Sequence, residues 1–191
     1  MDLTQVVMGT LDQSTKRRIA ESSGATPDQV SQVIAAGLPL IVGSMAKNAS
    51  TKAGADNLDK AIAAKHDGSL LDNLSAVTDN STIADGAKIL NHVLGANKET
   101  AVTKVAEKSG ASTNATATIL ATLAPVVMAQ LGRQKNKGKL SAEDIGNVLS
   151  SQKGAKGTAL MDLAVKFFDK NGDGSVLDDV IGMFFGSKKQ R

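Results

Sequence analysis

A short segment near the C-terminus has the residue types and the spacing of a calcium-binding loop. It reads Asp169-Lys170-Asn171-Gly172-Asp173-Gly174-Ser175, and it fits the first seven positions of the pattern D-x-N-x-D-G-x. In such a loop, oxygen atoms at alternate positions point into one pocket, and a glycine permits the sharp turn. The segment therefore predicts a site for Ca²⁺, a hard cation that prefers oxygen ligands.

The residue that would close this loop departs from the usual pattern. An EF-hand has a bidentate Glu at position twelve, which is Val180 in this chain, whereas two carboxylates stand just before it. A shortened loop could close on either of these from the first turn of the following helix. The candidate calcium ligands are Asp169, Asn171, Asp173, Ser175, Asp178 and Asp179.

The same residues also fit a simpler structure, a turn that leads into a helix. Asp-Gly-Ser is a common turn, and the N-terminus of a helix favours nearby carboxylates. A second copy of the phrase, Asp67-Gly68-Ser69, has Ala63 and Lys65 at the positions of the first two ligands. That copy predicts only a turn, and the C-terminal copy differs from it by carrying two ligands that calcium would need.

All four Phe residues flank this loop, as Phe167-Phe168 and Phe184-Phe185, and the chain has no Trp or Tyr. Aromatic rings bury large areas, so we expect a helix-loop-helix over residues 158–191 with its own small core. A surface docking patch is the alternative. Residues 1–166 contain no aromatic side chain, and they must pack through aliphatic side chains and Met.

Most other chemistries lack the residues that they need. The chain has no Cys, which excludes disulfides, a thiolate nucleophile and zinc or iron–sulfur sites built on Cys. His66 and His92 have no second ligand at metal spacing, and we expect them at a helix cap or on a partly buried helix face. The G-x-S-x-G, G-x-G-x-x-G and H-E-x-x-H motifs are absent. We therefore expect no catalytic residue; an enzyme using a metal near Asp169 and Asp173 is the alternative.

Basic residues gather in residues 133–139 (RQKNKGK) and in the tail, residues 188–191, although the net charge is only +3. Neither cluster has interleaved aromatic residues for base stacking. A solvated basic loop at 133–139 is the favoured interpretation. Weak nucleic-acid binding through this loop is the alternative, and it would weaken steeply with salt.

The chain repeats itself at a constant offset of 86 residues. Residues 19–25 (IAESSGA) match residues 105–111 (VAEKSGA), and Pro39 falls on Pro125. Self-similarity at a fixed offset indicates a duplicated structural unit. Because no stretch alternates β-branched or aromatic residues at period two, we expect helices and no strands.

Each copy predicts a short helix, a second helix that ends at Ser-Gly, and then a long apolar helix around a proline. Gly24 and Gly110 suit the position just after a helix end. Pro39 and Pro125 each remove one backbone donor, and we expect them to kink or split the long helices. The apolar stripes of these helices are Val30, Val33, Ile34, Leu38, Ile41 and Met45 in the first copy and Ile119, Leu120, Leu123, Val127 and Leu131 in the second.

The two longest low-charge stretches, residues 29–46 and 112–131, are rich in Ser, Thr, Ala and Gln. We expect them to be buried core helices and not membrane spans. The N-terminal sequence begins with an acidic residue and offers no apolar stretch of signal-peptide length. These features predict a cytoplasmic protein.

Several phrases together resemble the bacterial YidB-like family of domains of unknown function (DUF937). They are Gly24 with Pro39, residues 66–73 (HDGSLLDN), residues 85–95 (DGAKILNHVLG) and residues 169–179 (DKNGDGSVLDD). The resemblance implies an all-α bacterial protein. It implies no activity and no catalytic residue.

The sequence therefore predicts an all-α chain, a duplicated multi-helix unit forming a helical bundle with a C-terminal helix-loop-helix. Residues 1–80 are the first helical repeat and residues 81–157 are the second, and we expect the two repeats to pack together as one globular unit. Residues 158–191 form a helix, the Asp-rich loop, a second helix and the basic tail. The expected function is a non-catalytic interaction or scaffold module. Its partner would be another protein or a second copy, and Ca²⁺ is the one expected cofactor.

Overall fold

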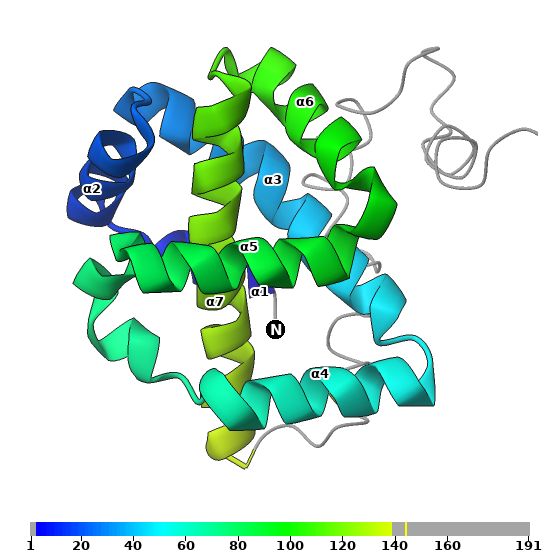
Figure 1. Cartoon of the computed structure of the whole chain (residues 1–191). Helices are drawn as coiled ribbons and strands as arrows, with labels where there is room; N and C mark the ends of the chain where they lie inside the picture. The colour runs from blue at the N-terminus through cyan, green and yellow to red at the C-terminus, as the bar shows by residue number, and fades with distance from the viewer. Residues whose placement is uncertain (1–2, 139–143, 145–191) are drawn as a thin grey trace, which may run out of the picture.

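Helix α7 (Thr113–Asn136) runs through the centre of the molecule, and the other helices surround it (Figure 1). The computed structural model describes residues 3–138 and residue 144. Within α7, every residue from Ile119 to Gly132 is buried. A helix that is apolar and buried all round needs neighbours on every side, so the positions of the other helices follow from α7.

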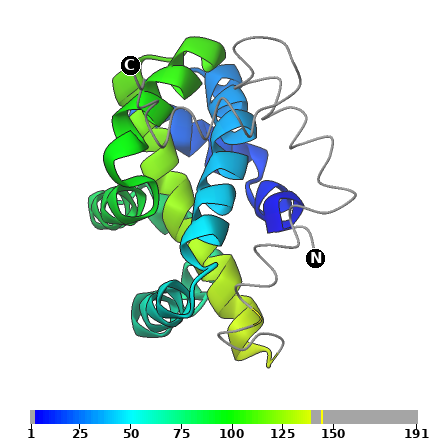
Figure 2. The same cartoon turned by 90° about the vertical axis from the view of Figure 1, so that its right-hand side faces the viewer.

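The described residues form α-helices and short 3-10 helices, without a strand. Figure 2 shows α7 between α5 on one side and α3 on the other. The elements that precede α7 are α1 (Leu3–Thr10), α2 (Gln13–Ser23), α3 (Pro27–Asn48), α4 (Lys52–Lys65), η1 (Ser69–Asp72), η2 (Leu74–Thr78), α5 (Asn80–Leu94), η3 (Gly95–Asn97) and α6 (Lys98–Ser109). The prediction of an all-α fold is confirmed.

The apolar stripes predicted for the two long helices are buried. Each of the eleven side chains named for these stripes is at most 2% exposed. The helix ends are also as predicted, since Gly24 (φ 71°) and Gly110 (φ 67°) follow α2 and α6 in the left-handed conformation. Thr26 caps α3, accepting a hydrogen bond from the Gln29 amide, and Pro27 is its first residue.

Both internal prolines lie in helices that continue on either side of them. Pro39 stands inside α3 and Pro125 inside α7, so of the two expected outcomes, a kink or a split, the split does not occur. A proline removes a single backbone donor, and the helices packed around α7 hold the remaining turns in place. Pro125 is itself buried in this packing.

The helix bounds follow the 86-residue offset of the sequence. Shifted by 86 positions, α2 and α3 would span residues 99–109 and 113–134, and α6 and α7 span residues 98–109 and 113–136. The two pairs also touch, because the Gln29 Nε2 donates to the Gly110 carbonyl oxygen at 2.6 Å. It stays a prediction that both helix pairs arose by duplication of one unit and that the two copies meet near residue 80.

Two helices of the body are long and apolar enough to cross a membrane by length and composition alone. The most apolar windows of α3 and α7 have mean hydropathies of 1.4 and 1.5. Inside this fold, 56% of the α3 window and 89% of the α7 window are buried. Burial to this extent in α7 is typical of the core helix of a globular domain.

Helices α5 and α7 approach each other closely because Gly86 has no side chain. A Cβ atom on Gly86 would lie 1.7 Å from the Ala121 carbonyl oxygen and 2.9 Å from Cδ of Pro125. Both of these atoms belong to the rigid part of α7, so they cannot move aside cheaply. The crossing of α5 over α7 therefore depends on this glycine.

Replacing Gly86 by Ala should destabilise the protein by ~1–3 kcal/mol, since the added methyl group overpacks the helix crossing. The matched control is Gly43→Ala in α3. An added Cβ at Gly43 meets nothing within 4 Å, and this change should stabilise the helix by roughly 0.5–1 kcal/mol. Urea unfolding measures both, and equal effects of the two changes would contradict the close approach of α5 and α7.

Candidate functional site

The predicted calcium site cannot be placed, because its residues lie outside the described part of the chain. This holds for all six candidate ligands, Asp169, Asn171, Asp173, Ser175, Asp178 and Asp179, and for the four Phe residues. Among residues 3–138, no group of three or more His, Asp or Glu side chains is arranged to hold a metal ion. The candidate site in the described part of the chain is of a different kind.

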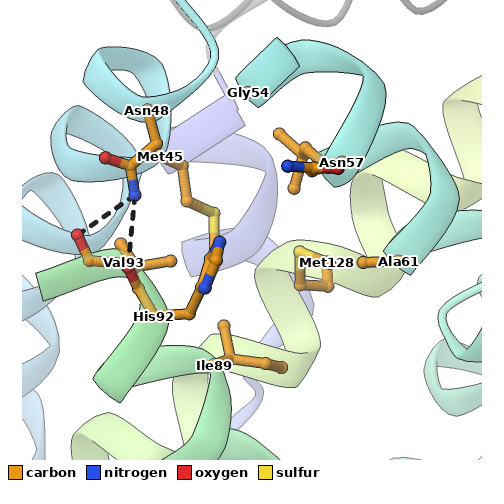
Figure 3. A pocket seen from close by; sticks show the side chains of 10 residues that line it. Met45, Asn48, Gly54, Asn57, Ala61, Ile89, His92, Val93 and Met128 are labelled. Atoms are coloured by element: carbon orange, nitrogen blue, oxygen red, sulfur yellow. Dashed lines mark hydrogen bonds between the residues drawn. The ribbon is translucent and has the colours of Figure 1, made fainter. Parts of the chain in front are cut away.

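An apolar pocket opens where α3, α4, α5 and α7 meet (Figure 3). Its volume is about 110 Å³. The lining residues are Met45, Asn48, Gly54, Asn57, Leu58, Ala61, Ile89, His92, Val93 and Met128. We call the cavity that these ten residues line the α4–α5 pocket.

One stripe of α4 forms a wall of this pocket. Gly54, Asn57, Leu58 and Ala61 are spaced i, i+3, i+4 and i+7, and so they share one face of the helix. The helix begins at a capping residue, since the Thr51 hydroxyl accepts a hydrogen bond from the Gly54 amide at 3.1 Å. This cap marks where α4 starts after the turn from α3.

The deepest part of the pocket is made by methionines from the two long helices. Met45 of α3 is 1% exposed and Met128 of α7 is 2% exposed. Methionine is flexible and polarisable, and it adapts its shape to different apolar ligands. Because its floor consists of methionines, the pocket can adapt to apolar groups of different shapes.

The rim of the pocket is polar and contains no Asp, Glu, Lys or Arg. Asn57 and His92 are exposed there, one from α4 and one from the last turn of α5 (Figure 3). The Asn48 Nδ2 donates to the carbonyl oxygens of His92 (3.5 Å) and Val93 (3.3 Å). Because these carbonyls belong to the end of α5, Asn48 joins that end to α3 beside the pocket.

A polar cluster joins the end of α7 to the turn after α4. The Arg133 Nη2 donates to the Gly68 carbonyl at 3.0 Å and pairs with Asp72. The Asn136 Nδ2 donates to the Asp67 carbonyl at 2.8 Å, and Lys135 of the same turn pairs with Asp59. We call these residues, with His66 and Asp85, the polar junction.

The polar junction corrects the interpretation of residues 133–139 as a solvated basic loop. Residues 133–136 are the last turn of α7, and the prediction is wrong for them. The side chains of Arg133 and Lys135 are only 30% and 28% exposed, and each meets a carboxylate. The prediction failed because these ion pairs are tertiary contacts, and the carboxylate partners lie more than sixty residues earlier in the chain.

His66 is the C-cap residue of α4, which agrees with the expectation of a helix cap. Its side chain is 10% exposed, and its Nε2 lies 3.3 Å from an oxygen of Asp85 in α5. Burial lowers the pKa of His66 below its ordinary value of 6.5, and the nearby Asp85 carboxylate only partly opposes this effect. The backbone here is tightly packed as well, since a Cβ on Gly132 would lie 1.7 Å from the His66 carbonyl oxygen.

A model of a family described as bacterial protein of unknown function (DUF937) matches residues 5–134, more than half of the chain. The chain belongs to the DUF937 family. No curated protein and no solved structure matches it.

The DUF937 region contains every residue of the α4–α5 pocket and ends within the last turn of α7. The predicted resemblance to this family is confirmed for that region. Residues 169–179, which resemble the family in the sequence, lie beyond the matched residues. The pocket is therefore a feature of the DUF937 region itself.

Lowering the pH from about 7 to about 5 should destabilise the protein partly through His66. Because burial lowers the folded-state pKa, the folded protein favours the neutral ring. The stability from His66 is fully present above its unfolded pKa, and it is lost as the pH falls through the folded pKa. In the His66→Gln variant, the unfolding free energy should therefore fall less between these pH values than in the wild type.

Urea unfolding of the wild type and of the His66→Gln variant at the two pH values measures this difference. A His66→Gln variant with an unchanged pH dependence would contradict the burial of His66 at the polar junction.

Proposed function

We propose that this DUF937 protein is a non-catalytic interaction module whose α4–α5 pocket binds an apolar side chain of a protein partner. The observation that carries the proposal is the lining of the pocket, with two methionines at its floor and a polar rim free of acidic residues, Lys and Arg. Hydrophobic anchors surrounded by a polar rim are the usual design of a protein-binding pocket.

The size of the pocket supports a side-chain ligand over a cofactor. Small-molecule sites usually measure about 300–1,000 Å³, and this pocket measures about 110 Å³. A dry engineered cavity of about 150 Å³ binds benzene. A volume of this order suits one large side chain that a partner inserts.

The chemistry of the lining supports a non-catalytic role. Among the described lining residues, His92 is the one titratable group, and acid–base catalysis usually needs a second positioned acid or base. The alternative function is an enzyme with a metal bound near Asp169 and Asp173. Its reaction would take place at those residues and not in the α4–α5 pocket.

Nucleic-acid binding through residues 133–139 is the weaker alternative. Phosphate binding draws on unpaired Lys and Arg side chains, and the polar junction pairs Arg133 with Asp72 and Lys135 with Asp59. Breaking these pairs would cost part of the binding energy. The structure of this turn thus favours the protein-binding proposal.

The Ala61→Trp variant should block the pocket, because Ala61 lines it from the exposed face of α4. The matched control is Ala63→Trp, which adds the same side chain to another exposed position of α4 that does not line the pocket. Toluene provides a small apolar probe, and the methyl NMR signals of Met45 and Met128 report its binding. We expect toluene to shift these signals in the wild type and in Ala63→Trp but not in Ala61→Trp.

The same two variants test binding of protein partners. Proteins captured from a bacterial lysate by the immobilised wild-type chain should be lost with Ala61→Trp and retained with Ala63→Trp. Far-UV circular dichroism must show that both variants keep the helical fold. Equal capture by the two variants would overturn the assignment of the pocket.

We also propose that the Asp169–Ser175 loop binds Ca²⁺ weakly, closed by Asp178 or Asp179, because its ligand pattern is incomplete. Calcium should raise the thermal midpoint of the wild type and move the amide NMR signals of Asp173 and Gly174. The Asp169→Ala/Asp173→Ala variant should lose both effects, whereas magnesium should produce neither. A calcium titration without any shift in the wild type would remove the loop from the proposed function.

A further inference from the structure

We propose that one phenyl ring of the Phe167-Phe168 pair of the same chain occupies the α4–α5 pocket in the free protein. This inference rests on the proposed function, and it adds the identity of an occupant. This ring and a side chain of a partner protein would then compete for the same pocket.

The first observation concerns the aromatic residues that residues 3–138, which we call the body, lack. Residues 3–138 contain no aromatic side chain, and a void remains where α4 and α5 diverge from α7. Protein interiors are normally filled to high density, and apolar atoms that line a void lose contacts. A large flat side chain from outside the body would restore the contacts of the two methionines at the floor, since sulfur atoms pack favourably against aromatic rings.

The second observation is what the C-terminal segment supplies. All four Phe residues of the chain lie between residues 167 and 185. Leu160, Leu163 and Phe167 are spaced i, i+3 and i+7, which is the spacing by which an amphipathic helix inserts its anchors into an apolar groove. The chain thus carries all of its aromatic anchors after the residues that match the DUF937 family.

The third observation is that the tether is long enough. Helix α7 ends at Asn136, whose side chain contacts the turn directly after α4. The 14-residue helix α4 is ~21 Å long. The 31 residues from Asn136 to Phe167 reach ~100 Å when extended, so the pair can reach the pocket even if part of the tether is helical. Tethering also raises the local concentration of the pair to the order of millimolar.

The experiment follows the methyl NMR signals of Met45 and Met128 in the full chain, with Met45→Leu and Met128→Leu used for assignment. In the wild type, a docked phenyl ring should shift at least one of these signals upfield. The Phe167→Leu/Phe168→Leu variant should lose this shift and should bind toluene more tightly than the wild type. The Phe184→Leu/Phe185→Leu variant is the matched control, and it should keep both properties of the wild type.

Two further outcomes separate this inference from the proposed function. If the Phe167→Leu/Phe168→Leu variant leaves the methionine signals and the toluene affinity unchanged, the inference is overturned, although the pocket still binds the probe. If toluene shifts neither methionine in that variant, both the inference and the proposed function fail.

Mixing tests whether the contact is made within one chain. Labelled Phe167→Leu/Phe168→Leu protein is combined with unlabelled wild type. Return of the upfield shift in the labelled chain would overturn docking within one chain and indicate docking onto a second copy. Signals that stay as in the unmixed variant support the contact within one chain.

Discussion

The complete burial of α7 is the constraint on which the rest of the structure depends. From Ile119 to Gly132 the helix has no solvent-exposed face, so α5, α3 and the turn after α4 must all pack against it. At two of these contacts the chains approach so closely that a Cβ atom would not fit. Gly86 meets the backbone of α7 on one side, and Gly132 of α7 meets the His66 carbonyl on another.

The α4–α5 pocket and the polar junction follow from how α4 ends and how it diverges from α7. At its C-terminal end, α4 is held to α7 and α5 by the polar junction. Toward its N-terminal end, the aliphatic side chains of an aromatic-free body leave a pocket above the buried Met45 and Met128. The same packing that buries α7 with small residues thus leaves a cavity where larger side chains are absent.

Local patterns made most of the helices predictable, whereas the site depends on contacts between distant residues. The apolar stripes and the glycines after α2 and α6 could be predicted because periodicity and caps act within one or two turns. The pocket could not, since it joins four helices whose angles no local pattern reports. The same reason explains the wrong prediction at Arg133, because its partner Asp72 lies 61 residues away. The continuity of α3 and α7 through Pro39 and Pro125 likewise depends on tertiary packing.

Native-state hydrogen exchange of the α7 amides tests the central claim, that this helix is buried on every side and organises the fold. If it is, the amides from Ile119 to Gly132 should exchange only through global unfolding, with opening free energies equal to the free energy of unfolding in urea. The amides of α4, which is more exposed, should open at lower free energies. Exchange of the α7 amides through local opening, at free energies like those of α4, would contradict the account.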